Sequence, residues 1–151
     1  MKHGLHSHCN GEEVLPRSLQ AEISLAIAAI AVKPGRGAGR LLRESFLTNL
    51  RVSGWSSEVA VAPGSYMTVT SMKHEVGLCL QTGNMARMYA DLMKLQTLYL
   101  NNAIKSAAIV IPSEPLAKVL GCNIAQAKRL ARELAIFKKA YHVPTVIFSL
   151  E

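Results

Sequence analysis

A short run of polar residues joins an apolar segment to an amphipathic helical segment in the middle of the chain. The apolar run 76–80 leads into Gln81, and the turn 82–84 ends at Asn84, where helical periodicity begins. Polar side chains at a junction between strand and helix often face a binding site. Gln81 and Asn84 are therefore candidates to contact a ligand, and the Gln81 amide is suited to orienting a water molecule.

A glycine-rich basic loop precedes this junction at residues 33–40, which read KPGRGAGR. Arg36 and Arg40 belong to the loop, and Arg43 follows within the next helical turn. Backbone amides and guanidinium groups at a helix start are suited to binding phosphate groups. The loop lacks the Gly-Lys-Ser/Thr ending of a nucleotide-binding P-loop. It predicts phosphate contacts or, about equally well, a flexible connection.

Cys79 offers a different chemistry, because a thiol can act as a nucleophile. His74 lies five positions earlier and is the nearest candidate base. A nucleophilic thiol needs a pKa lowered by a nearby cation or a helix N-terminus. A cysteine inside an apolar run is more often a small core residue. We expect Cys79 to be in the core.

The elements that must position these residues alternate between helical and extended patterns. Helical periodicity and breakers predict helices at about 15–33, 40–51, 85–99, 113–119 and 123–141. Val- and Thr-rich or continuous apolar runs predict strands at 55–62, 66–72, 76–81, 105–112 and 143–150. This order predicts an α/β domain with a central mixed β-sheet flanked by α-helices.

The predicted helix 85–99 separates apolar from charged residues. Its Met, Leu and Tyr side chains recur at three- and four-residue spacing and should face a core. Arg87, Asp91 and Lys94 are expected on the other side, spaced for ion pairing.

Composition favours one folded unit. The chain has 151 residues, of which 50% are hydrophobic, enough for a core without disulfides. Residues 1–14 are polar and rich in histidine, which predicts a flexible N-terminal tail before a single domain at 15–151.

Charge and cysteine content restrict the partners and the compartment. A formal charge of +7 favours an anionic partner, nucleic acid first, although a merely basic soluble protein fits as well. The three cysteines form no Cys-x-x-Cys pair, which suits a reducing cytoplasm. No stretch reaches the roughly 20 apolar residues that span a bilayer, so we expect no membrane association.

The chain resembles restriction endonucleases of the BglII and BstYI type, a branch of the PD-(D/E)XK nucleases. The resemblance rests on four segments, VGLCLQTGN at 76–84, RMYADLMKL at 87–95, LGCNIA at 120–125 and REL at 132–134. It implies a restriction-endonuclease-like fold, a double-stranded DNA partner and assembly as a homodimer. With DNA as the expected partner, our candidates for DNA-phosphate contacts are Arg36, Arg40, Arg43, Asn84 and Arg87.

The family's catalytic acids are missing from the matching positions. In that family an Asp on one strand is followed on the next by Glu-x-Gln, and the two acids bind a divalent metal beside the scissile phosphate. Gln81 matches the final Gln, but Cys79 stands at the Glu position and Thr70 at the Asp position. Neither supplies the hard anionic oxygen that Mg²⁺ prefers.

Three other acids are candidates to replace them, namely Glu75, Asp91 and Glu44. Each also has an ordinary structural interpretation: a turn residue for Glu75, a partner of Arg87 or Lys94 for Asp91, and a solvated helix position for Glu44.

Three functions are therefore open. The first is a DNA-binding relative of type II restriction endonucleases that is catalytically impaired or inactive, with no cofactor. The second is an active Mg²⁺-dependent DNA endonuclease with a migrated carboxylate. The third is a non-enzymatic scaffold for protein interaction or dimerisation.

Overall fold

Five strands form one mixed β-sheet in the computed structural model, which describes all of residues 1–151. In spatial order they are β1 (His3–His8), β7 (Thr145–Leu150), β6 (Ser106–Pro112), β5 (Val76–Leu80) and β4 (Ser71–Lys73). The central strands β7, β6 and β5 run parallel, whereas β1 and β4 pair antiparallel at the edges. The predicted mixed sheet is confirmed. A separate hairpin contains β2 (Val59–Ala60) and β3 (Thr68–Val69).

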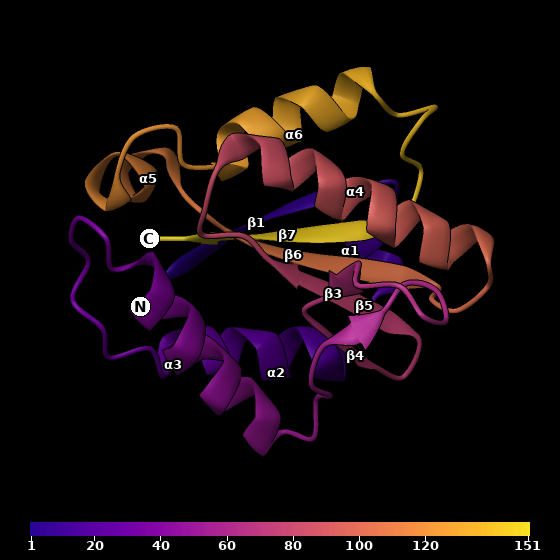
Figure 1. Cartoon of the computed structure of the whole chain (residues 1–151), viewed down its shortest axis with the longest axis horizontal. Helices are drawn as coiled ribbons and strands as arrows, with labels where there is room; N and C mark the ends of the chain where they lie inside the picture. Colours follow the sequence, from indigo (N-terminus) through magenta and orange to yellow (C-terminus); the bar gives the residue numbers. More distant parts are fainter.

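Helices cover both faces of the sheet (Figure 1). On one face lie α2 (Arg17–Ala28) and α3 (Gly39–Val52), and on the other lie α4 (Met85–Leu100) and α6 (Ala127–Ile136). The short α5 (Glu114–Leu120) follows β6, and the single-turn α1 (Gly11–Val14) follows β1. The molecule is thus a three-layer domain, as the order of predicted elements indicated.

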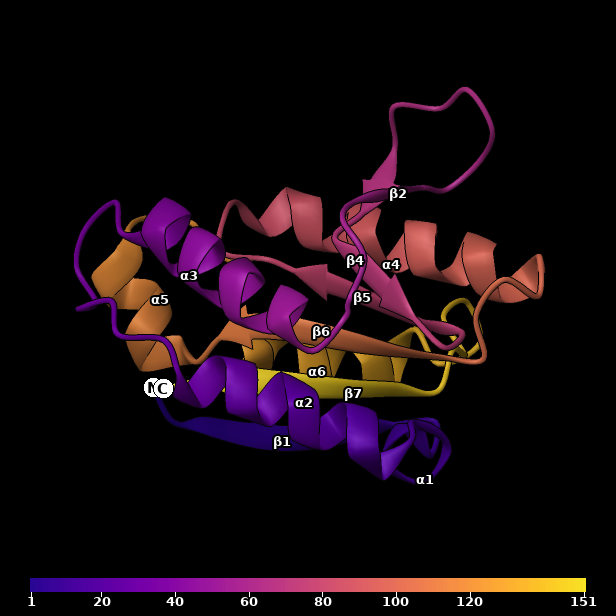
Figure 2. The same ribbon diagram turned by 90° about the horizontal axis from the view of Figure 1, so that it is seen from below.

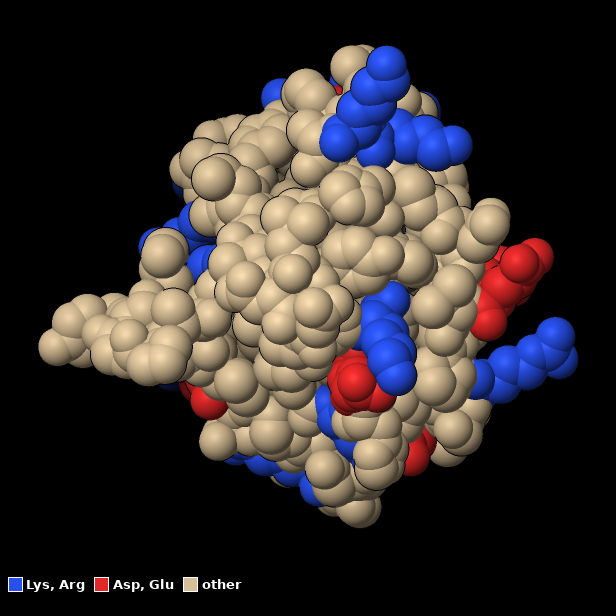
Figure 3. Space-filling model, turned by 90° about the vertical axis from the view of Figure 1, so that its right-hand side faces the viewer, with Lys and Arg blue, Asp and Glu red and all other residues tan.

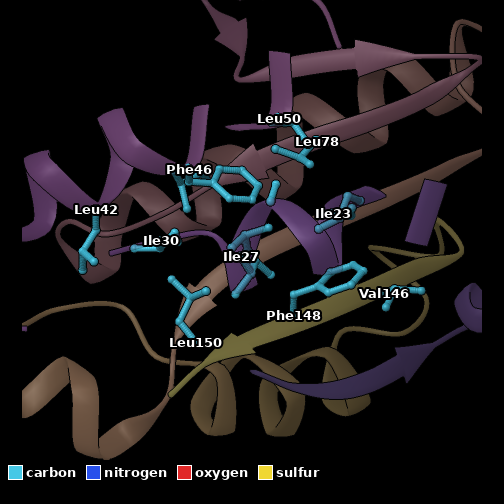
Figure 4. Close-up of a cluster of buried hydrophobic side chains, with 14 of the residues drawn as sticks. Ile23, Ile27, Ile30, Leu42, Phe46, Leu50, Leu78, Val146, Phe148 and Leu150 are labelled. Carbon is cyan, nitrogen blue, oxygen red and sulfur yellow. The ribbon is translucent and has the colours of Figure 1, made fainter. Parts of the chain in front are cut away.

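The alternation of side chains along the strands divides the core in two. In β5, Val76, Leu78 and Leu80 face α2 and α3, whereas Cys79 faces α4. Figure 4 shows the first core, where residues of α2 and α3 such as Ile27 pack toward Phe148 of β7. Both faces of β5 and β6 are therefore buried, which explains their continuous apolar sequences.

Gly77 lets α4 pack closely on β5. A Cβ atom at this position would lie 3.0 Å from Leu95 Cδ2 and 3.2 Å from Ile104 Cδ1. The absence of a side chain therefore sets how near α4 can lie to β5, the strand that leads into Gln81.

The prediction of a flexible tail at residues 1–14 is wrong. Residues 3–8 form β1, which pairs with β7 from His3 opposite Leu150 to His8 opposite Thr145. Main-chain hydrogen bonds hold an edge strand whatever its side chains, and five of the six β1 residues are at least partly accessible, which suits their polarity. Gly11 then packs on β7, because a Cβ there would lie 2.2 Å from the Thr145 backbone.

The last helix is shorter than the predicted 123–141. Asn123 has a left-handed backbone, with φ of 55°, and Gln126 is extended, so α6 begins only at Ala127. It ends at Ile136, ahead of Lys138 and Lys139. α2 begins just after Pro16, as predicted, but it ends at Ala28 and not at residue 33. The remaining predicted helices agree with α3, α4 and α5 to within about one residue at each end.

Each helix is too short or too polar to cross a lipid bilayer.

Candidate functional site

A cleft of about 660 Å³ opens where β5 ends, between α3, α4 and the β2–β3 hairpin. In Figure 1, α3 and α4 lie on the two sides of the end of β5. Gln81 is at the base of the cleft, at the carboxyl end of a parallel strand, which is where ligands bind in open α/β sheets. Three residues of the predicted junction, Gln81, Thr82 and Gly83, therefore line the cleft.

The start of α3 and the turn after Gln81 lie against each other and form one wall. Thr82 donates a hydrogen bond from its hydroxyl to the Gly39 carbonyl at 3.1 Å. A Cβ on Gly39 would lie 3.0 Å from the Thr82 carbonyl oxygen, so only glycine fits this approach without displacing the turn. The glycine-rich loop thus has a packing role at the site.

The base of the cleft is a polar network of Gln81, Asp91 and Lys94. Gln81 Nε2 donates to Asp91 Oδ2 at 2.9 Å, and its Oε1 accepts from the Gly83 amide at 2.9 Å. Lys94 Nζ donates to the other carboxylate oxygen, Oδ1, at 3.0 Å. Asp91 is only 9% exposed and each of its oxygens has a partner. Its charge is therefore already balanced within the protein.

The position of Asp91 corrects one expectation and confirms another. We predicted it on the charged outer side of the helix, but it shares the buried face of α4 with Met88 and Leu95. Spacings of three and four residues place these three side chains on one stripe. Its predicted ion pair is formed with Lys94, not with Arg87.

A second ion pair crosses the cleft from α3 to the hairpin. Arg43 donates from Nη2 to Glu58 Oε1 at 3.1 Å and from Nη1 to the Leu80 carbonyl oxygen at 3.2 Å. The Thr68 hydroxyl donates to the other oxygen of Glu58 at 3.4 Å. Glu58 and Lys94 were not among the predicted site residues. The sequence signal for Glu58 was weak, since it is a single acid within the predicted strand 55–62.

Thr70 and Cys79, which we matched to the family's acid positions, lie in different surroundings. Thr70 lines the cleft, and its hydroxyl accepts a hydrogen bond from the Leu80 amide at 3.0 Å. Cys79 is 1% exposed in the core beneath α4, and burial raises the pKa of its thiol well above the usual range. His74 is exposed at the turn before β5. The hypothesis of a Cys79–His74 nucleophile is therefore wrong.

Two of the three candidate acids do not line the cleft. Glu75 lies in the turn that precedes β5, at the opposite end of this strand from Gln81, and pairs with Lys105 at 3.0 Å. Glu44 is exposed on α3 and pairs with Arg40 at 3.6 Å. Only Asp91 is in contact with Gln81.

The basic candidates divide in the same way. Arg40, Arg43 and Arg87 line the cleft, whereas Arg36 does not. Asn84 does not line it either, because its Oδ1 caps α4 by accepting from the Ala86 amide at 2.8 Å. Four cations, with Lys94 included, line the cleft with two carboxylates, and Arg40 pairs with Glu44 outside it, which leaves one cation without an ion pair.

Among the four cations that line the cleft, only Arg87 has no partner in the protein. It is exposed, and it forms neither an ion pair nor a side-chain hydrogen bond, unlike Arg40, Arg43 and Lys94. An unpaired guanidinium at the rim of a cationic cleft is suited to bidentate contact with a phosphate.

The donors of the cleft do not fit a magnesium ion. Mg²⁺ is usually held by one or two free carboxylates with near-ideal octahedral geometry. Here Glu58 is paired with Arg43, and Asp91 with Lys94 and Gln81. No group of three or more His, Cys, Asp or Glu side chains is arranged to hold a metal ion.

Comparison with known proteins gives one consistent result. Residues 3–150 match the family described as restriction endonuclease BglII/BglIII. The crystal structure of BglII complexed with a DNA 16-mer superposes with a TM-score of 0.87 at 12% identity, covering 100% of this chain and 78% of that one. Free BglII gives a TM-score of 0.74 at 14% identity, covering 100% of this chain and 80% of that one. No curated protein matches the sequence.

Proposed function

Because the chain belongs to the BglII/BglIII restriction endonuclease family, we propose that it binds the backbone of double-stranded DNA in the cleft and is catalytically impaired or inactive. The charge balance of the cleft carries this proposal. Both carboxylates of the cleft are neutralised by neighbouring cations, Arg40 pairs with Glu44 on α3, and the unpaired positive charge of Arg87 remains to attract phosphate. The similar BglII structure with a DNA 16-mer supports DNA as the partner.

Phosphate binding and phosphodiester hydrolysis place different demands on the site. Binding needs positive charge and hydrogen-bond donors, which Arg40, Arg43 and Arg87 supply. Hydrolysis also needs an activated water and a stabilised leaving oxygen, which nucleases commonly obtain from bound metal ions. Thr70 and Cys79 add no negative charge that would hold such an ion.

The two functions are separated by measuring binding and cleavage on the same preparation. A fluorescein-labelled duplex of mixed sequence should bind with roughly micromolar affinity at physiological salt, as expected for non-specific contacts. The logarithm of the affinity should fall linearly with the logarithm of salt concentration, and EDTA should leave it unchanged. Supercoiled plasmid should remain intact in Mg²⁺ and Mn²⁺.

Arg87→Gln should weaken duplex binding and reduce the salt slope by about 1, because one phosphate contact is lost. Arg51→Gln is the matched control, since Arg51 is an exposed cation on α3 outside the cleft. Loss of affinity in both variants alike would indicate general attraction to a basic surface and would count against the cleft.

A second function is favoured by one observation, the contact between Asp91 and Gln81. If Asp91 has replaced the missing acids, the protein is a Mg²⁺-dependent DNA endonuclease. It would then nick plasmid in Mg²⁺ or Mn²⁺, and both Asp91→Asn and Gln81→Ala would abolish nicking. Calorimetry would detect binding of the metal alone.

A third function, a scaffold for dimerisation, draws on an apolar groove of about 400 Å³ between α4 and the end of α6. Met93 and Phe137 are exposed along it. A second copy of the chain is the partner expected from the family. Absence of duplex binding at low salt, together with a dimer in analytical ultracentrifugation that Met93→Asp dissociates, would favour this function.

The free thiols support our placement of the protein in the reducing cytoplasm.

A further inference from the structure

The β2–β3 hairpin projects beyond the rest of the fold, next to the cleft (Figure 2). Its loop is ordered by its own hydrogen bonds. The Ser65 amide donates to the Ala62 carbonyl at 3.1 Å across a turn in which Gly64 has φ of 73°. The Met67 amide donates to Ser65 Oγ at 3.0 Å. The tip therefore has a defined shape before it meets any partner.

The base of the hairpin is fixed to the protein, but its tip is not. Val61 and Val69 are buried beside α4, and Thr68 lines the cleft. Beyond them Tyr66 is 103% exposed and Met67 is 60% exposed. Neither side chain contributes to the core, so the fold does not account for an aromatic and a thioether at this point.

The hairpin is also uncharged. From Val59 to Met72 the sequence reads VAVAPGSYMTVTSM, without an acid or a base. In Figure 3 the projection at the left of the view shows only residues other than Lys, Arg, Asp and Glu. An uncharged projection beside a cationic cleft matches the division of a DNA surface into phosphates and groove, since phosphate contacts position a protein and base contacts specify the sequence.

We infer that the hairpin tip enters the major groove of the duplex whose phosphates occupy the cleft, with Tyr66 and Met67 contacting base edges. This inference rests on the function proposed above. The major groove admits a two-stranded β-ribbon, and the minor groove is only about half as wide. Two extended residues from Thr68 to Tyr66 reach about 7 Å, comparable with the depth of the groove.

The tip and the cleft should leave different signatures in duplex binding. Tyr66→Ala removes a groove contact and no charge, so it should lower affinity at least about fivefold with an unchanged salt slope. Arg87→Gln should lower both the affinity and the salt slope. Leu25→Ala is the matched control, since Leu25 is an exposed apolar residue on α2. Thermal unfolding should be unchanged in Tyr66→Ala, because the side chain packs on nothing.

The outcomes separate the two proposals. If the wild type binds the duplex and Tyr66→Ala and Met67→Ala bind equally well, the inference is overturned while the DNA-binding function stands. If the wild type does not bind, both fall. Displacement of the protein from the duplex by the major-groove ligand methyl green supports the assignment. Displacement of the protein only by the minor-groove ligand distamycin contradicts it. A dimer that dissociates in Tyr66→Ala, with duplex binding retained, would make the tip a protein interface and overturn the inference.

Discussion

Gln81 donates its side-chain amide to Asp91 across 2.9 Å, and this hydrogen bond joins the end of β5 to the middle of α4. Because the same amide group accepts from the Gly83 main chain, its orientation is fixed, with nitrogen toward the acid. The Gln81 amide nitrogen is thus already engaged by a carboxylate. The cleft consequently presents its unpaired charge from Arg87, at the rim, and not from its base.

Replacing Asp91 by Asn should strengthen DNA binding. The change removes a negative charge that repels phosphate and should raise duplex affinity at low salt roughly threefold. It leaves Lys94 without its partner and should cost about 1 kcal/mol of the free energy of unfolding. Fluorescence anisotropy and urea unfolding measure the two effects. Glu75→Gln is the control, because this acid lies at the other end of β5. Weaker binding by Asp91→Asn would instead favour a catalytic or metal-binding role.

Placing an acid at Thr70 should create metal affinity. Thr70 lines the cleft, and an Asp carboxylate can accept the bond from the Leu80 amide that the hydroxyl accepts now. Thr70→Asp should raise affinity for Mn²⁺ roughly tenfold by adding a hard anionic ligand, and should weaken duplex binding when metal is absent. Calorimetry with Mn²⁺ alone measures the first effect. Thr70→Asn, which has the same shape and no charge, should show neither.

The buried position of Cys79 predicts slow thiol chemistry. Burial raises the pKa of its thiol and blocks access, whereas Cys122 is exposed. With iodoacetamide at neutral pH, mass spectrometry should find Cys122 alkylated first and Cys79 unmodified until the protein is unfolded. Rapid modification of Cys79 in the folded protein would revive the nucleophile hypothesis.

The Glu22–Lys73 ion pair predicts a stability that depends on pH. Glu22 accepts from Lys73 Nζ at 2.8 Å and from Trp55 Nε1 at 2.8 Å, and the bond from Lys73 lowers the pKa of its carboxyl below 4.5. A carboxyl group whose pKa is lower in the folded state than in the unfolded state stabilises the fold at any pH above its unfolded-state pKa. This stabilisation is lost as the pH falls through the folded-state pKa. Glu22→Gln should therefore cost about 1 to 2 kcal/mol at neutral pH.

That difference between wild type and Glu22→Gln should shrink as the pH falls below 4.5. Urea unfolding can be followed by the fluorescence of Trp55, the only tryptophan, which is buried in the native state. A difference that stays constant down to strongly acidic pH would show that packing, and not ionisation, explains the loss.

Local sequence patterns predicted the layers but not the edge of the sheet. The apolar runs that became β5 and β6 and the periodicity of α4 are properties of short windows. The edge strand β1 has a polar sequence, and its pairing depends on β7, more than 130 residues away. No local pattern contains that information.

The site was predictable where chemistry and position coincide in one segment. Gln81 and the arginines at 40, 43 and 87 were predicted as site residues because a breaker, a charge or the resemblance marked them, and all four line the cleft. Glu58 was missed because its role arises from a contact with Arg43 on the preceding helix, 15 residues away, which no local periodicity indicates. Asp91 was assigned to the solvent side although its spacing from Met88 and Leu95 already placed it on the buried stripe.

The pairing of β1 with β7 also has a consequence for folding during translation. β1 precedes β7 by more than 130 residues, so β1 leaves the ribosome well before the strand that completes its hydrogen bonds. Until β7 emerges, the main-chain donors and acceptors of β1 must be satisfied by water. The sequence of β1 is polar apart from Leu5, so the unpaired strand stays hydrated and offers little apolar surface to a neighbouring nascent chain.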